Sequence, residues 1–234
     1  MPDTLGYRKI FGLLLPSMNT VVQPECESLR PEGVTNQVAR FSVSSGGEPL
    51  DLLAAADRLI TCEPDALVLG ISMDAVPGGL EKARQLREEL AAHSGLPVAG
   101  GTEATREALR ALGAKRIAVV TPFKPAGDAN VRAAFEASGF EVLAVQGLKC
   151  ENFKVIADLG ADAVKAAFRS VVSERVDAVV QVGTALPAVR LVFELEQELG
   201  APIVAVNAAT YWLALRQNGI ADQRTDLGRL FADH

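Results

Sequence analysis

The chain has 234 residues, of which 49% are hydrophobic and 22% are charged, and its formal net charge is −6. This length suits one or two domains with a hydrophobic core that needs no covalent cross-links. The acidic balance excludes a protein that binds nucleic acid nonspecifically through a basic surface, and no apolar run approaches the roughly 18 residues of a membrane span.

In the first half of the chain, short apolar runs alternate with amphipathic segments. Runs that are apolar throughout are typical of strands covered by helices on both faces, whereas apolar residues three to four apart indicate helices. The predicted strands are residues 8–15, 38–43, 65–72 and 97–100, and the predicted helices are 21–30, 49–61, 80–93 and 103–112.

The second half repeats this order after a short connection at residues 113–116. Its predicted strands are 116–121, 140–145, 177–184 and 202–206, and its predicted helices are 127–138, 160–174, 186–199 and 208–218. Strands that alternate with helices of this length predict parallel sheets and therefore an α/β fold. The tail at 228–231 is too short to form a further domain.

Strand-like stretches of the first half recur in the second. The matching pairs, which lie about 105 to 112 residues apart, are 11–16 with 117–122, 65–72 with 177–184, and 97–102 with 202–207. We therefore predict two pseudo-symmetric halves, residues 1–112 and 113–234, each a mainly parallel sheet flanked by helices. Ligands favour clefts between domains and the carboxyl ends of parallel strands, so we expect the site in the cleft between the halves, beside Ser72 and Thr184.

The cysteines and the N-terminus bear on the compartment. Cys26, Cys62 and Cys150 are odd in number and lack metal-ligand spacing, so they suggest neither a disulfide framework nor a zinc site. The first ten residues lack the apolar core of a secretion signal. We expect a cytoplasmic protein without nucleic-acid or membrane partners.

A set of motifs spread over nearly the whole chain resembles one branch of the aspartate/glutamate racemase superfamily, the maleate cis-trans isomerases and arylmalonate decarboxylases. This resemblance implies two pseudo-symmetric α/β halves with the site between them, no metal or organic cofactor, and a homodimer or homotetramer. The motifs are Pro16-Ser17-x-Asn19-Thr20, the stretch from Leu109 to Pro122, Asn152, Asn207-x-x-x-Tyr211-Trp212 and the stretch from Gly228 to Phe231.

The resemblance also implies a cysteine at one or both of the two repeated strand ends, where a thiol adds to a double bond or exchanges a proton beside a carboxylate. Here the first position falls on Ile71 or, one residue later, Ser72, and the second falls on Gly183. The aromatic hydroxyl that the isomerases carry after Thr-Pro is replaced by Phe123. Standard two-cysteine isomerisation is therefore not predicted.

What remains resembles the part of the site that holds a carboxylate, together with backbone N–H groups at strand ends and helix N-termini. Asn19 either holds the ligand or caps the helix that follows it, and Asn152 either contacts the ligand or makes a loop hydrogen bond. The candidate substrate-binding residues are Ser17, Asn19, Ile71, Thr102, Phe123, Asn152, Gly183 and Asn207.

Five residues are candidates for proton transfer or nucleophilic catalysis. Ser72 with Asp74 supplies a hydroxyl and an acid, although no histidine lies near in sequence and Ser72 also suits a turn. Glu103 is a general base if burial raises its pKa, or an ordinary acidic residue of a first helical turn. Thr184 is a hydrogen-bond donor or a helix cap, and Cys150 is a relocated nucleophile or a packed thiol.

The leading hypothesis is a cofactor-independent isomerase or lyase that acts on a small carboxylate or dicarboxylate through an enolate-like intermediate. One alternative is a hydrolase or lyase that uses Ser72 with Asp74 or Glu103. The other is a carboxylate-binding protein that kept the pocket and lost the chemistry.

Overall fold

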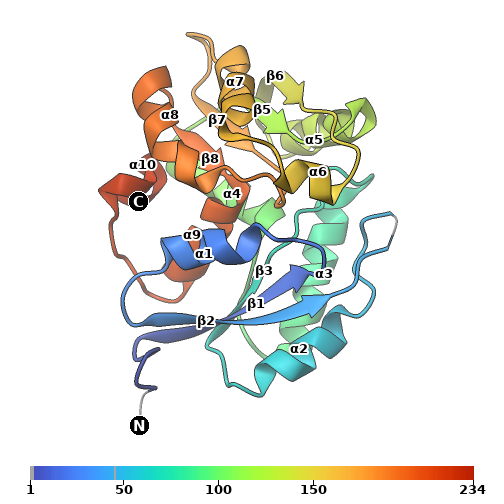
Figure 1. Ribbon diagram of the computed structural model, residues 1–234, viewed down its shortest axis with the longest axis vertical. Coiled ribbons are helices and arrows are strands. Elements are labelled where there is room, and N and C mark those ends of the chain that lie inside the picture. The colour runs from blue at the N-terminus through green and yellow to red at the C-terminus, as the bar shows by residue number, and fades with distance from the viewer. Residues whose placement is uncertain (1–2, 45) are drawn as a thin grey trace.

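The computed structural model describes residues 3–44 and 46–234 and contains two four-stranded parallel sheets. The first lies in the lower part of Figure 1 and the second in the upper part. The first sheet has the order β2-β1-β3-β4 and consists of β1 (Lys9–Pro16), β2 (Val34–Phe41), β3 (Ala66–Leu69) and β4 (Val98–Gly100). The second has the order β6-β5-β7-β8 and consists of β5 (Arg116–Thr121), β6 (Glu141–Gly147), β7 (Ala178–Gln181) and β8 (Ile203–Ala205).

Helices cover both faces of each sheet. The first half contains α1 (Val22–Leu29), α2 (Leu52–Ile60), α3 (Gly79–Ser94) and α4 (Gly101–Ala111). The second contains α5 (Pro125–Ala137), α6 (Phe153–Ala157), α7 (Ala161–Val171), the 3₁₀ turn η1 (Val189–Leu191), α8 (Val192–Leu199), α9 (Val206–Gln217), the 3₁₀ turn η2 (Thr225–Leu227) and α10 (Arg229–Asp233). The predicted α/β fold with two parallel sheets is confirmed.

Alternate side chains of β3 enter different cores. Leu67 and Leu69 pack with residues of α2 and α3, whereas Ala66 and Val68 belong to the larger core that also contains residues of α1, α4 and the second half. This alternation follows from the two-residue period of a strand. It also determines which residues beyond the end of β3 face the second half.

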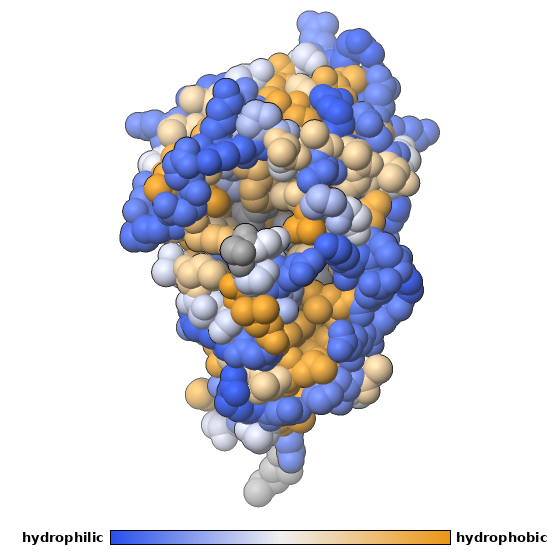
Figure 2. All heavy atoms as spheres, turned by 90° about the vertical axis from the view of Figure 1, so that its right-hand side faces the viewer, coloured by the Kyte–Doolittle hydropathy of each residue, from blue (hydrophilic) through white to orange (hydrophobic). Residues whose placement is uncertain are grey.

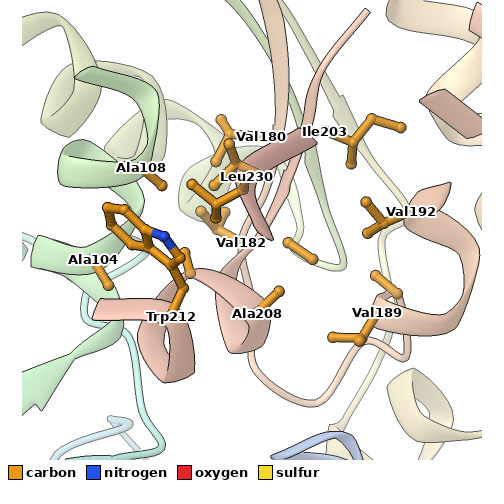
Figure 3. Close-up of a cluster of buried hydrophobic side chains, with 14 of the residues drawn as sticks. Ala104, Ala108, Val180, Val182, Val189, Val192, Ile203, Ala208, Trp212 and Leu230 are labelled. Atoms are coloured by element: carbon orange, nitrogen blue, oxygen red, sulfur yellow. The ribbon is translucent and has the colours of Figure 1, made fainter. Parts of the chain in front are cut away.

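Helices α4 and α9 pack against each other across the boundary between the halves (Figure 1). Figure 3 shows Ala104 and Ala108 of α4 beside Trp212 of α9. The alanines are small, so the indole ring fits against the α4 backbone, and all three side chains are buried. Because each of these helices joins the other half, the boundary at residues 112/113 remains a prediction.

The structure corrects several predicted elements. The strand predicted at 38–43 is Val34–Phe41, and the chain after it turns back through an isolated antiparallel bridge between Val43 and Pro49. The helix predicted at 186–199 begins only at η1, and the chain before it forms a turn closed by the Leu186 N–H on the Gly183 carbonyl. Helices α6 and α10 were not predicted; with five residues each, they are too short for a periodic pattern.

Candidate active site

The carboxyl ends of β1 and β2 point to the right in Figure 1. Figure 2 views the molecule from that side and shows a face that is hollowed near its middle, between the upper and lower parts. Several predicted site residues belong to the loops that follow these and the neighbouring strands.

At the end of β3, Ile71 and Ser72 face opposite ways. Ile71 packs with the core on the α2 and α3 side of the sheet. Ser72 faces α4, since a Cβ placed on Gly101 would lie 3.4 Å from the Ser72 Cβ and 2.9 Å from Cγ2 of Val206. Of the two sequence candidates for the first catalytic position, Ser72 is therefore the one on the side of the second half.

Asp74 is fully buried and forms an ion pair with Arg106 of α4, with 2.5 Å between Oδ1 and Nη1. Thr102 donates its hydroxyl to Asp74 Oδ2 over 3.2 Å and accepts the Met73 N–H over 3.0 Å. The Arg106 guanidinium also lies 4.0 Å above the Phe135 ring of α5. Asp74 and Thr102 therefore hold the loop after β3 in place, and the Asp74 carboxylate has a permanent cationic partner.

At the end of β7, Gly183 has a φ of +96°, in the left-handed region that favours glycine. A Cβ at this position would lie 2.6 Å from both Cδ and Cγ of Pro122 and 3.3 Å from Cζ of Phe123. Position 183 therefore has room for no side chain, and a cysteine would not fit there without movement of Pro122.

Thr184 is held from two sides. Its hydroxyl accepts a hydrogen bond of 3.1 Å from Nδ2 of Asn19, and its carbonyl accepts one of 3.0 Å from Nδ2 of Asn207. The Asn19 carbonyl oxygen accepts the N–H groups of Val21 and Val22, at 2.9 and 3.0 Å. Asn19 thus caps the start of α1 and also links the two halves, so the two roles considered for it are not exclusive.

Sequence reasoning missed Glu25, a buried carboxylate on α1. Its Oε1 accepts the N–H groups of Ala188 and Val189, each at 2.9 Å, and its Oε2 accepts Nδ2 of Asn207 at 2.7 Å. Burial raises the pKa of Glu25, and these three donors oppose the rise. The signal was present, because Glu25 lies on the apolar face of α1 that Val22 and Leu29 define.

Gln181, the last residue of β7, was also missed. Its side-chain nitrogen donates to the carbonyls of Val182 and Gly183, at 2.8 and 2.9 Å, and its oxygen accepts the Val206 N–H at 3.3 Å. Val206 also lies beside Gly101 and hence near Ser72. Gln181 therefore shapes the loop after β7 and connects it to the neighbourhood of Ser72; a polar residue in an otherwise apolar strand was its signal.

Backbone N–H groups without acceptors gather at both strand ends. Within residues 3–44 and 46–234, the N–H groups of Ile71 and Ser72 make no hydrogen bond to the chain, and neither do those of Gly183, Thr184 and Ala185. The left-handed Gly183 followed by a turn, closed by the Leu186 N–H on the Gly183 carbonyl, is the type of backbone that forms an anion-binding concavity. Backbone N–H groups without an acceptor in the chain can donate to a ligand oxygen.

The remaining candidates follow the carboxyl ends of β1, β5 and β6. Phe123 is half-buried beside Gly183, and Ser17 is exposed. Asn152 is exposed and accepts the Val155 N–H at 3.1 Å, so it caps α6. The Cys150 N–H donates to the Pro122 carbonyl over 2.9 Å, and partial burial raises the pKa of its thiol.

Glu103 lies against α3 and pairs with Arg87 there over 3.0 Å. Burial raises the pKa of the Glu103 carboxyl, and Arg87 partly offsets this. The other two thiols stand elsewhere: Cys26 is buried on α1, and Cys62 follows α2 at the amino end of β3. Among the residues that the structure describes, no group of three or more His, Cys, Asp or Glu could hold a metal ion, and no helix is long and apolar enough to cross a membrane.

Comparisons with known proteins place this geometry in a family. The maleate isomerase of Nocardia farcinica is 27% identical over an alignment of 245 positions, which covers 97% of this chain and 96% of the relative. The structure of Nocardia farcinica maleate cis-trans isomerase bound to Tris, also at 27% identity, superposes with a TM-score of 0.83 over 95% of this chain and 97% of that one.

Arylmalonate decarboxylase shares the fold, with a TM-score of 0.78 at 18% identity over 95% of this chain and 98% of that one. The model of the arylmalonate decarboxylase family matches residues 52–231 of this chain. This match spans more than half of the sequence and confirms the resemblance inferred from its motifs. The chain belongs to the arylmalonate decarboxylase family.

Proposed function

We propose that this protein is a cofactor-independent enzyme that binds a small carboxylate or dicarboxylate between its halves and acts through an enolate-like intermediate, without a cysteine at either strand end. Isomerases and decarboxylases among its relatives support an enzyme of this general type. The finer assignment rests on the chain's own residues.

The observation that carries the proposal is the set of unpaired N–H groups at the ends of β3 and β7. When a carbon beside a carboxylate loses a proton or carbon dioxide, negative charge moves onto the carboxylate oxygens. Preorganised backbone donors stabilise such charge without reorganisation during the reaction. Five N–H groups at two adjoining strand ends suit both the bound carboxylate and the enolate.

Polar side chains would orient this ligand rather than react with it. Asn19 and Thr184 hold each other across the halves, and Asn207 fixes the Thr184 carbonyl, so the three set the direction of the loop after β7. Asn152 remains a candidate ligand contact at the rim, in addition to capping α6. Ser17 and Phe123 are further candidates for the walls around the ligand.

Proton transfer falls to few groups. Asp74 and Glu103 are both engaged in ion pairs, which makes Ser72 and Cys150 the better candidates. A neighbouring structure of Nocardia farcinica maleate cis-trans isomerase contains a covalently bound succinylcysteine intermediate. No equivalent adduct can form at either strand end of this chain, because Ile71, Ser72 and Gly183 carry no thiol.

Two other functions compete with this proposal. A hydrolase that uses Ser72 would need a partner to activate the hydroxyl, and within the described residues Ser72 makes no side-chain hydrogen bond to an acid or a histidine. A carboxylate-binding protein without catalysis would need only the N–H groups. Ligand binding without turnover would distinguish such a binding protein from an enzyme.

Proton NMR in D₂O with maleate, fumarate, malonates, 2-substituted succinates and aspartate tests the proposal. It detects isomerisation, decarboxylation and exchange of a proton beside a carboxylate in one experiment. We expect turnover or exchange with at least one acid, and at least a hundredfold loss in Asn19→Ala. Ser72→Ala and Cys150→Ser then assign the proton-transfer group. Cys62→Ser is the matched control, because Cys62 lies at the amino end of β3, away from the loops that follow the strands.

Turnover that is unchanged in Asn19→Ala would contradict the assigned site. A thermal shift with one of these acids but no reaction would favour the binding protein. Loss of activity in Cys62→Ser would show that the variants act through stability rather than chemistry.

A further inference from the structure

A cavity lies between α3 and α4, at the carboxyl ends of β3 and β4. It has a volume of about 180 Å³. Its apolar wall consists of Leu69, Ile71, Met73, Leu80, Ala83 and Leu86.

More cationic than anionic side chains line this cavity, and the cations differ in how fully they are paired. Arg84, Arg87 and Arg106 line it together with one acid, Glu103. Arg84 is already held by Glu81 and Glu88 on the surface of α3. Arg87 forms an ion pair through its Nε with Glu103 Oε2, which is itself buried without a hydrogen-bond partner, and within the described residues the two terminal nitrogens of Arg87 donate no hydrogen bond.

Arg106 adds an unsatisfied donor. Its side chain is 4% exposed; its Nη1 forms an ion pair with Asp74 and donates to the Thr102 carbonyl, and its Nε donates to the Ser138 hydroxyl. Its Nη2 is buried and has no hydrogen-bond partner in the described chain. A buried guanidinium nitrogen without a partner is costly, and a ligand that approaches it is favoured.

We propose that the α3–α4 cavity binds a small monocarboxylate with a compact apolar body, of which benzoate is the simplest probe. An apolar cavity of about 150 Å³ holds a benzene ring, so the volume here admits one aromatic ring or a short branched chain. The free nitrogens of Arg87 are the donors for the carboxylate, at a rim where the Arg87 side chain is 31% exposed. The apolar body then lies among the leucines, Ile71 and Met73.

This site differs from the proposed active site, although the same loop borders both. The side chain of Ile71 lies on the cavity side of the sheet, whereas Ser72 faces α4 and the second half. A ligand in the cavity would therefore contact the loop after β3 on its Ile71 side. It would not contact the N–H groups at the end of β7. The inference does not depend on the reaction proposed above.

The test is ¹⁹F NMR of 3-fluorobenzoate titrated with the full chain, with fluorobenzene as the uncharged comparison. We expect saturable binding of 3-fluorobenzoate. Arg87→Met should weaken it about tenfold or more, as the loss of a charge-assisted hydrogen bond predicts, and should leave fluorobenzene unaffected. Ala83→Phe fills the cavity and should abolish binding of both probes.

Arg110→Met is the matched control, because Arg110 is an exposed arginine of α4 that pairs with Glu107 and does not line the cavity. Asn19→Ala separates the two sites: binding in the α3–α4 cavity should survive this change, whereas binding at the N–H groups should not. Loss of 3-fluorobenzoate binding in Asn19→Ala, or full binding in Ala83→Phe, would overturn the proposal. So would the absence of binding to the wild-type chain at millimolar probe.

Discussion

The two repeated strand ends occupy equivalent places in the two halves, yet different interactions hold them. At the end of β3, a buried ion pair between Asp74 and Arg106 fixes the loop, and Ser72 offers a hydroxyl. At the end of β7, the side-chain amides of Gln181 and Asn207 fix the loop, and Gly183 offers backbone alone. A shared topology thus supports one loop with a buried ion pair and the other with side-chain amides, of which Asn207 also donates to Glu25.

This difference indicates how a duplicated architecture becomes an asymmetric site. The loop after β3 can present a side chain to a ligand, because its backbone is secured elsewhere. At position 183, the loop after β7 can present only its backbone, because Pro122 fills the space that a side chain would need. Substitutions at Asp74, Gly183, Glu25 and Asn152, each with its own comparison variant, test this contrast.

The largest effect is expected at the ion pair of the β3 loop. Asp74→Ala leaves the Arg106 guanidinium buried without its anion, and removal of one partner of such a pair costs about 3–5 kcal/mol. Urea unfolding measures this as a drop in the free energy of unfolding. Glu107→Gln, which breaks the exposed pair with Arg110, is the control and should cost less than about 1 kcal/mol. Equal effects would mean that the β3 loop does not depend on buried charge.

At the β7 loop, Gly183→Ala should cost about 2–4 kcal/mol from left-handed strain together with the contact with Pro122. Gly139→Ala separates the two causes. Gly139 has a φ of +89°, close to that of Gly183, but open space where its Cβ would stand. Gly139→Ala should lower the free energy of unfolding by about 1 kcal/mol. If both variants lower the free energy of unfolding equally, the contact of the new Cβ with Pro122 does not affect stability.

Glu25 should make the link between the halves sensitive to pH. Because its pKa is raised, the folded state keeps a proton that the unfolded chain releases near pH 4.5, and stability therefore falls as pH rises above that value. One such proton changes the free energy of unfolding by at most about 1.4 kcal/mol per pH unit. Glu25→Gln should flatten this slope in urea unfolding series between pH 4 and pH 8, whereas Glu27→Gln, on the exposed side of α1, should not. An unchanged slope in Glu25→Gln would contradict the raised pKa.

The smallest effect is expected at Asn152. Asn152→Asp keeps an oxygen that caps α6, so stability should stay within about 0.5 kcal/mol, whereas Asn152→Ala should cost about 1 kcal/mol at most. If Asn152 also contacts a carboxylate ligand, the aspartate should weaken binding through like-charge repulsion. Tight binding by Asn152→Asp would restrict Asn152 to its role as a cap.

The repeat made the fold predictable from sequence. Apolar runs such as 65–69 and 178–180 identify buried strands without any long-range information, because both of their faces are covered. The start of β2 was misplaced, since its partly polar residues from Thr35 onward do not read as a strand until they pair with β1. Helix α6 lies below the length at which a periodic pattern can be recognised.

The candidate site was only partly predictable, for a physical reason. Asn19 and Thr184 were identified, but their contact joins residues 165 positions apart, which no local pattern contains. The roles of Asp74 and Glu103 depend on arginines of other helices, and the sequence gives no sign of this pairing. Glu25 and Gln181 did leave local signals, as polar residues in apolar segments.

The central claim is that backbone N–H groups at both strand ends form the carboxylate site. A ¹⁵N–¹H NMR titration of the labelled protein with malonate tests it most directly. We predict saturable shifts of the amide signals of Ser72, Gly183 and Thr184 with one common dissociation constant, and no shifts in the α2 and α7 amides. Shifts confined to one strand end, or absent from Gly183 and Thr184 while malonate binds elsewhere, would contradict the account.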